Sequence, residues 1–266
     1  MNITLPSHRQ DRLTTLLTTF LQQKYTTKRK WQQLLGEHRS MSLAPHSTKY
    51  LFSILQYPLR QCSTRRFRIP LLAHTTLRNW MDLLQALHTT PVPIAMVVPH
   101  TPHFWAASDA SSLGFGGFWL PSSLANDTQP YVWRLALAPA IKQRLLTTSN
   151  PAGDITINDL ELAATCLGYA TQLHHSTLSS FTSTCIATDN TPAAAWVTKG
   201  SPTMVGPPTF LLRQLALESR KHNAALTALY TPGTTNIIAD FLSRSFHLTD
   251  DELFYHLQHL EPIQPP

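Results

Sequence analysis

Residues 104–120 read Phe104-Trp105-Ala106-Ala107-Ser108-Asp109-Ala110-Ser111-Ser112-Leu113-Gly114-Phe115-Gly116-Gly117-Phe118-Trp119-Leu120. Two short runs rich in aromatic residues, 104–109 and 114–120, are separated by residues typical of a tight turn, and this pattern predicts two strands joined by a hairpin. A third run of the same kind follows at 130–135. The sequence therefore predicts a three-stranded meander in the middle of the chain.

The segments after the meander alternate between helical and strand periodicity. We predict helices at 157–173, 192–199 and 208–222, strands at 184–189 and 225–230, and a helix that begins near residue 235. The order βββαβααβα predicts an α/β domain built on a five-stranded mixed sheet with flanking helices.

The first hundred residues have a helical pattern instead. Helices are predicted at 9–24, 27–43, 48–59 and 77–87, the second with an apolar side formed by Trp31, Leu34, Leu35, His38 and Met41. Four prolines between 91 and 103 exclude a regular helix there and indicate an extended connector. We therefore expect a helical basic module at 1–90, a proline-rich connector at 91–103, an α/β domain at 104–247, and a C-terminal helix and tail at 248–266.

The charge of the chain is divided unevenly between these parts. Residues 1–100 hold 13 of the 21 Lys and Arg residues but only 3 of the 15 Asp and Glu residues, so their net charge is +10 while the remainder carries −4. Three cysteines without C-x-x-C spacing exclude a disulfide scaffold and a zinc module. With no apolar run long enough to span a membrane and no secretory leader pattern, we expect an intracellular protein, nuclear or cytoplasmic, without membrane contact.

Acidic residues are scarce, so the positions of four of them are informative. Asp109 and Asp189 end predicted strands, Glu161 lies early in the long helix, and Asp240 lies in the last helix of the α/β domain. Carboxylates gathered at one edge of a sheet would repel one another and would bind hard divalent cations. The alternative is that each is ordinary, with the aspartates starting turns or capping helices and the glutamate favouring the helix dipole.

The sequence segments around these four carboxylates resemble the motifs of a known protein family. Residues 108–116, 157–164, 187–195 and 232–244 resemble, in this order, four motifs of the ribonuclease H domain of retroelement reverse transcriptases: the "TDAS…GxG" opening, the "S.KELLA" helix, the "SDNTTAVA" strand end and the "PG..N..AD.LSR" close. The four matches span about 140 residues. They are most similar to gypsy-type and DIRS-type retrotransposons, whose thumb and connection segment resembles Leu34-Leu35-Gly36-Glu37.

The resemblance implies a ribonuclease H-like fold and an endonuclease that depends on divalent metal and cleaves the RNA strand of an RNA–DNA hybrid. It implies that Asp109, Glu161, Asp189 and Asp240 are catalytic and hold two Mg²⁺ ions, with Mn²⁺ as an alternative ion and Asp109 bridging the two. The implied partners are the hybrid and other parts of a retroelement polyprotein. For contacts to nucleic acid we expect the following residues: Lys28, Arg29, Lys30, Arg65, Arg66, Arg68, Ser111 and Asn190.

The chain departs from the family pattern at two points. Tyr230-Thr231-Pro232-Gly233 stands where the family often has histidine in "HxPG", so a role of that histidine does not transfer. No "YxDD"-like turn occurs, so the chain should not polymerise DNA; Thr249-Asp250-Asp251-Glu252 is instead typical of a capping box. Two alternatives stay open: a non-catalytic nucleic-acid-binding remnant of a transposon, and an enzyme of related fold such as an integrase or Holliday-junction resolvase.

Three further features have simpler interpretations. The glycines of Gly114-Phe115-Gly116-Gly117 favour a tight hairpin with close backbone approach over a phosphate-binding loop, because no helix follows and a third glycine at the right spacing is missing. His174 and His175 are typical of a helix end. The basic side chains of residues 1–100 are either a phosphate-binding surface or a solvated helix face.

Overall fold

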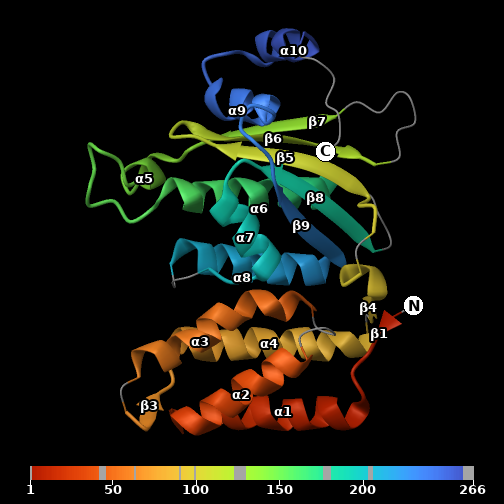
Figure 1. Cartoon of the computed structure of the whole chain (residues 1–266), viewed down its shortest axis with the longest axis vertical. Helices are drawn as coiled ribbons and strands as arrows, with labels where there is room; N and C mark the ends of the chain where they lie inside the picture. Colours follow the sequence, from red (N-terminus) through yellow and green to blue (C-terminus); the bar gives the residue numbers. More distant parts are fainter. Residues whose placement is uncertain are drawn as a thin grey trace. The chain divides into compact units, whose positions relative to one another are not determined.

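The computed structural model describes residues 2–41, 46–62, 64–89, 91–98, 100–122, 130–175, 181–202 and 206–259. The chain forms two compact units (Figure 1). Unit 1 contains residues 1–100 and 199–224, and unit 2 contains residues 101–198 and 225–266. Residues 42 and 43 at the end of the second predicted helix and residues 260–266 of the predicted tail lie outside the described residues.

Unit 1 is mainly helical. Its elements are α1 (Ser7–Gln22), α2 (Lys28–Met41), the 3₁₀ helix η1 (His46–Leu51), α3 (Phe52–Gln61), α4 (Leu71–Thr89), η2 (Ile94–Met96) and α8 (Pro207–Lys221). Two short antiparallel pairs accompany the helices, β1 (Asn2–Ile3) with β4 (Val92–Pro93) and β2 (Tyr25–Thr27) with β3 (Arg66–Arg68). Strands of two or three residues show too little periodicity to be predicted from sequence.

The predicted apolar side of α2 is confirmed. All five of its predicted side chains are buried. Trp31 makes edge-on contacts with Phe20 and Phe67, and its indole N–H donates to the carbonyl of Leu55 at 2.7 Å. Burial of Trp31 therefore joins α1, α2, α3 and β3 in one core.

Three helices of unit 1 differ from the sequence prediction. α4 begins at Leu71, well before the predicted start at residue 77. Residues 46–51 form a 3₁₀ turn, and α3 continues through Pro58 to Gln61. Pro58 lacks an N–H but keeps its carbonyl, which accepts from the Cys62 N–H at 3.1 Å, so the last turn still closes. α8 packs on η1 and α4 of unit 1, whereas its place in the sequence grouped it with residues 104–247.

Unit 2 has the predicted α/β architecture, a mixed five-stranded sheet with flanking helices. Its strands are β5 (Phe104–Ala110), β6 (Gly114–Pro121), β7 (Tyr131–Ala136), β8 (Thr182–Thr188) and β9 (Ala224–Tyr230), in the spatial order β7-β6-β5-β8-β9. β5 pairs antiparallel with β6, and β6 with β7, whereas β8 runs parallel to β5. The meander and the mixed five-stranded sheet are thus confirmed.

Helices cover both faces of this sheet (Figure 1). α6 (Ile157–His175) packs with Phe115 and Ala110, and α9 (Ile237–Arg244) packs with Phe118 and Ala107. Successive strand residues point to opposite faces, which explains why Phe115 and Phe118 belong to different cores. The other helices are α5 (Pro139–Lys142), α7 (Thr191–Lys199) and α10 (Asp250–Gln258).

The predicted capping box of the last helix is present. The Thr249 hydroxyl accepts from the Glu252 N–H at 3.3 Å, and the Glu252 carboxylate accepts from the Thr249 N–H at 2.8 Å. Asp250 belongs to the first turn of α10 and pairs with Arg134 of β7 at 2.7 Å. None of the helices in the described ranges could span a lipid bilayer.

Candidate metal centre

Two parallel strands deliver two aspartates to one edge of the sheet. Trp105 is paired with Cys185 and Ala107 with Ala187, so the same register carried two residues further places Asp109 opposite Asp189. Asp109 is the next-to-last residue of β5, and Asp189 directly follows β8. Because parallel strands end at the same edge, residues 80 positions apart in sequence become neighbours.

The third carboxylate comes from α6. Thr156 caps this helix, and Asp159 accepts from the Thr156 N–H at 2.7 Å and from its hydroxyl at 2.9 Å, so Asp159 serves the helix start. Glu161 lies two residues further on and is buried. Carboxylate oxygens of Asp109, Glu161 and Asp189 all lie within 4.8 Å of one another. We call these three residues the carboxylate cluster.

The three carboxyl groups of the cluster all have raised pKa values, so their charged forms are disfavoured. Burial, with the charges of Asp189 and Asp240 adding to it, raises the pKa of Asp109 to about 6 against the lowering effect of the Ser243 hydrogen bond. Burial raises the pKa of Glu161 to about 8, and the charges of Asp109 and Asp189 act in the same direction. Burial and the charge of Asp240 also raise the pKa of Asp189. A cation among the three carboxylates would relieve both the repulsion and the lost hydration.

Asp240 lies apart from the carboxylate cluster. Its carboxylate accepts from Arg244 Nε at 2.7 Å, one turn further along α9, and its side chain is 46% exposed. The Ser243 hydroxyl lies 2.9 Å from the Asp240 carbonyl oxygen and also reaches the Asp109 carboxylate, which places Asp240 at the same edge of the sheet. The charge of Asp240 raises the pKa of both Asp109 and Asp189. Of the four predicted carboxylates, three come together directly, and the fourth is held by an arginine.

Contacts from α9 orient Asp109. The Ser243 hydroxyl lies 2.5 Å from Oδ2 of Asp109, and the Ser111 hydroxyl donates to the Ser243 carbonyl at 2.6 Å. The Asn236 side chain, just before α9, donates to the Ser108 carbonyl at 3.1 Å. Ser243 is part of the "LSR" ending quoted above, but the sequence did not indicate that it reaches Asp109.

The close approach of α9 depends on glycine. Gly116 is the strand partner of Asp109, and a Cβ there would lie 2.3 Å from the Ser243 backbone nitrogen. A Cβ at Gly114 would meet Phe246, and one at Gly117 would meet the Ala107 carbonyl oxygen. The glycine run therefore allows close packing against the hairpin, as the sequence predicted.

The loop after β9 lies against the cluster. A Cβ at Gly233 would be 2.8 Å from Oδ2 of Asp189, and the Thr231 N–H donates to the Thr188 carbonyl at 3.0 Å. Tyr230, which stands where the "HxPG" pattern would have histidine, ends β9 with an exposed side chain. This glycine contact was another feature that the sequence did not indicate.

The two polar residues expected to contact nucleic acid in unit 2 have internal partners. Ser111 is buried, and its hydroxyl also accepts from the N–H groups of Leu113 and Gly114. The Asn190 side chain accepts from the Ala193 N–H at 2.9 Å, as a helix cap would, and donates to Asn158 Oδ1 at 2.8 Å. Both side chains thus serve the turns beside the cluster.

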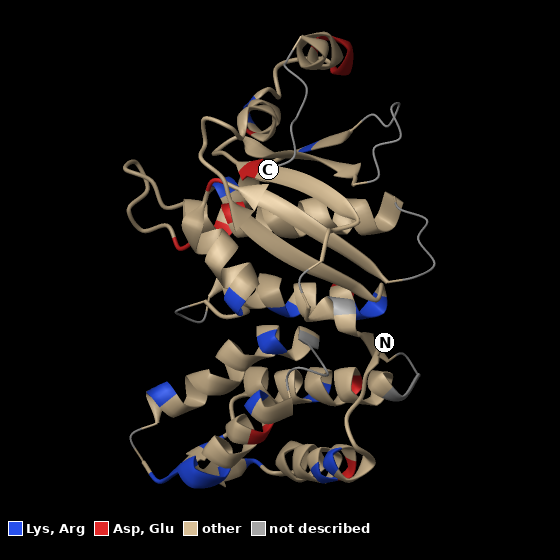
Figure 2. Ribbon diagram, turned by 45° about the vertical axis from the view of Figure 1, so that its right-hand side comes forward, with Lys and Arg blue, Asp and Glu red and all other residues tan. Residues whose placement is uncertain are grey.

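The six basic residues expected to bind nucleic acid lie in unit 1. Lys28, Arg29 and Lys30 begin α2, and Arg65, Arg66 and Arg68 lie in and beside β3. Lys30, Arg66 and Arg68 line two adjoining cavities, whereas the other three do not. In Figure 2, Lys and Arg gather in unit 1 around the start of α2 and β3, and Asp and Glu gather at one edge of the sheet in unit 2.

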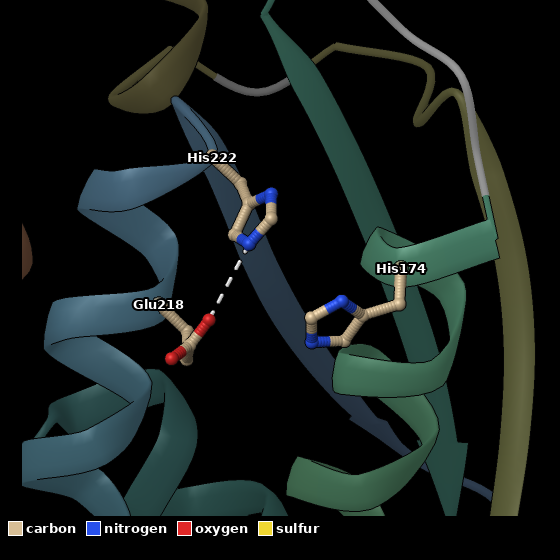
Figure 3. A group of neighbouring side chains, drawn as sticks. All are labelled: His174, Glu218 and His222. Carbon is tan, nitrogen blue, oxygen red and sulfur yellow. Dashed lines mark ion pairs between the residues drawn. The ribbon is translucent and has the colours of Figure 1, made fainter.

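A further ion pair lies at the end of α8. His222 Nε2 is 3.4 Å from Oε2 of Glu218, one helical turn earlier (Figure 3). His174, also drawn there, belongs with His175 to the last turn of α6 in unit 2, the helix-end placement that the sequence predicted.

No protein-family model matches the chain, and no curated protein matches it. Solved structures do match in part. Ribonuclease H1 from the halophilic archaeon Halobacterium salinarum NRC-1 is 15% identical with a TM-score of 0.36, over 57% of this chain and 98% of that one. LC11-RNase H1, solved in complex with an RNA/DNA hybrid, is 12% identical with a TM-score of 0.38, over 52% of this chain and 92% of that one. The foamy viral protease-reverse transcriptase, solved in complex with an RNA/DNA hybrid, is 16% identical with a TM-score of 0.33, over 73% of this chain and 28% of that one.

Proposed function

We propose that this protein is a divalent-metal-dependent endonuclease that cleaves the RNA strand of RNA–DNA hybrids. The observation that carries the proposal is the carboxylate cluster: three carboxylates with oxygens within 4.8 Å of one another, two of them with strongly raised pKa values. Such an oxygen donor set fits Mg²⁺ or Mn²⁺.

Each residue of the site has a proposed task. Asp109, Glu161 and Asp189 hold the metal, and Ser243 fixes the Asp109 carboxylate through its hydrogen bond. Asp240 is the proposed fourth ligand, and its ion pair with Arg244 must open for that role. When bound, divalent ions supply activation of water and stabilisation of the leaving oxygen. The choice of the RNA strand must come from contacts to 2′-hydroxyl groups, because DNA and RNA share the attacked phosphate.

We also propose the origin that the sequence motifs indicate. The chain would be a part of a retroelement reverse transcriptase of DIRS or gypsy type, with the helical basic module at 1–90, the connector at 91–103 and the nuclease domain at 104–247. Its partners would be the hybrid and other parts of that polyprotein. The alternative of a non-catalytic remnant predicts binding of nucleic acid without cleavage.

A cleavage assay separates these functions. An RNA–DNA hybrid labelled on the RNA strand is incubated with the full chain in Mg²⁺, in Mn²⁺ and in EDTA. We expect RNA cleavage with either metal and none in EDTA. Asp109→Asn should lower the rate by orders of magnitude, because it removes one carboxylate charge from the cluster at nearly constant shape.

Asp154→Asn is the matched control. Asp154 is exposed and pairs with Arg144 outside the carboxylate cluster, so this variant should cleave like the original chain. Equal cleavage by Asp109→Asn and the original chain would refute the proposed site. Binding of the hybrid with no cleavage in either metal would favour the non-catalytic alternative.

A further inference from the structure

Unit 1 contains a groove beside the β2–β3 pair. Two adjoining cavities of about 580 and 380 Å³ share Lys24 as a lining residue. The larger is also lined by Arg68, Arg78 and the first turn of α4, and the smaller by Lys30, Arg66 and Tyr25. Tyr25 and Arg68 are directly opposed in the strand pair, so the two cavities meet there. We call the two together the basic groove.

The strand pair turns one face to the core and the other to the groove. Thr26 is buried, and its strand partner Phe67 contacts Trp31. Neighbouring strand residues point the opposite way, which brings Tyr25, Arg66 and Arg68 to the outer face. The pairing register thus places the two arginines and the tyrosine side by side on the face of the strand pair that lines the groove.

The positive charge of the groove is uncompensated. No carboxylate is among the lining residues of the groove. Five cationic side chains line it: Lys24, Lys30, Arg66, Arg68 and Arg78. In the described part of the chain, all ion pairs are formed by other residues, and none includes one of these five cations. The first turn of α4 adds the partial positive charge of its N–H groups. A chain of phosphates is the ligand that complements such a groove.

Exposed apolar groups beside the cations indicate which kind of nucleic acid fits the groove. The Tyr25 side chain is 51% exposed, and the Arg66 guanidinium lies 5.5 Å above its ring centre. Leu71, which lines the larger cavity, is 79% exposed. A duplex presents its phosphates but hides its base faces, whereas a single strand offers both, and aromatic platforms beside basic grooves bind unpaired bases by stacking.

We infer that the basic groove binds single-stranded nucleic acid, with the five cations on its phosphates and Tyr25 stacked on a base. Lys24 and Arg78 join the basic residues that the sequence indicated, while Lys28, Arg29 and Arg65 lie outside the groove. This binding goes beyond the proposed cleavage and does not depend on it.

The test measures affinity in EDTA, where the carboxylate cluster holds no metal. A fluorescent single-stranded oligodeoxynucleotide and the blunt duplex of the same sequence are titrated with the full chain at several salt concentrations. Arg68→Gln should weaken single-strand binding and lower the slope of log affinity against log salt by about 0.7, the value for one lost phosphate contact. Arg9→Gln removes the same charge from an exposed position on α1 outside the groove and should leave that slope unchanged.

Tyr25→Ala separates stacking from charge. It should weaken single-strand binding about tenfold with an unchanged salt slope, and Tyr25→Phe should restore the affinity. Thermal unfolding by circular dichroism checks that each variant is folded. Equal effects of Arg68→Gln and Arg9→Gln would refute the groove as the binding site. Duplex bound as tightly as the single strand, with no effect of Tyr25→Ala, would refute the assignment to single strands. Neither result would bear on cleavage of a hybrid in Mg²⁺.

Discussion

The hydroxyl of Ser243 lies 2.5 Å from Oδ2 of Asp109, although 134 positions separate the two residues in sequence. Ser243 is on α9 and Asp109 is on β5, so this contact joins a helix on one face of the sheet to the edge where the carboxylates meet. A hydrogen bond of this kind favours the charged carboxylate and fixes its direction. Ser243 therefore lowers the pKa of Asp109 against the stronger effect of burial.

Ser243→Ala should weaken metal binding. Without the hydroxyl, the pKa of Asp109 should rise further, and the cluster should take up a cation only at higher pH. We expect roughly tenfold weaker Mn²⁺ binding near neutral pH, as for other residues that support a metal ligand. Calorimetric titration with Mn²⁺ at pH 6 and pH 8 measures this, and the deficit should be larger at pH 6. A deficit that is the same at both pH values would contradict a role through the Asp109 charge.

Gly116→Ala and Gly36→Ala should have opposite effects on stability. A methyl group at Gly116 meets backbone atoms of Leu242 and Ser243, so we expect a loss of about 1–3 kcal/mol as α9 is pushed off the sheet. Gly36 lies within α2 with no atom within 4 Å of an added Cβ, and alanine there should stabilise by about 0.5–1 kcal/mol. Urea unfolding of both variants and the original chain measures the difference, and equal midpoints would contradict the close approach of α9.

Without metal, unit 2 should lose stability as the pH rises. The pKa of Glu161 is about 8 and that of Asp109 about 6 in the folded chain, against ordinary values of 4.5 and 3.8 in the unfolded chain. Between these values the folded state binds more protons than the unfolded state. The free energy of unfolding therefore falls with rising pH, by up to about 1.4 kcal/mol per pH unit for each such group.

Urea unfolding in EDTA at pH 5, 6.5 and 8 measures this loss. Adding Mg²⁺ at pH 8 should reverse it, because a bound cation stabilises the charged carboxylates. Glu161→Gln should flatten the pH dependence in EDTA and remove most of the Mg²⁺ effect. A pH dependence unaltered by this substitution would show that the cluster is not its origin.

Unit 1 should be destabilised by acid through His38. Burial against the rings of Trp80 and Phe52 lowers the pKa of His38 to about 4, with the Thr48 backbone hydrogen bond opposing this and the Arg39 charge adding to it. Because the unfolded pKa is 6.5, the stability from neutral His38 is present above pH 6.5 and is lost as the pH falls toward 4, in total about 3 kcal/mol.

Tryptophan fluorescence during urea unfolding at pH 7, 5.5 and 4.5 follows this loss, because His38 lies against the indole of Trp80. His38→Phe should reduce the acid sensitivity. His74→Phe is the control, because His74 belongs to the same unit but is only partly buried. Acid sensitivity that persists in His38→Phe would assign the effect to other groups.

Much of unit 2 could be predicted because its signals are local. The alternation at 104–120, the glycine run and the capping box at Thr249 each depend on residues close in sequence, and all three are present in the structure. The same holds for the apolar side of α2, since helical periodicity alone brings Trp31 and His38 to one face.

Contacts between distant segments were decided only by the tertiary structure. Motif order singled out Asp109, Glu161, Asp189 and Asp240, but the pairing of β5 with β8 and the start of α6 bring together just the first three, while Arg244 holds the fourth. The contact of Ser243 with Asp109 depends on where α9 crosses the sheet. The basic groove depends on a three-residue strand pair whose register places Tyr25 opposite Arg68. Sequence periodicity reports which side of an element is buried, whereas strand register and helix crossing are set by packing between segments far apart in the chain.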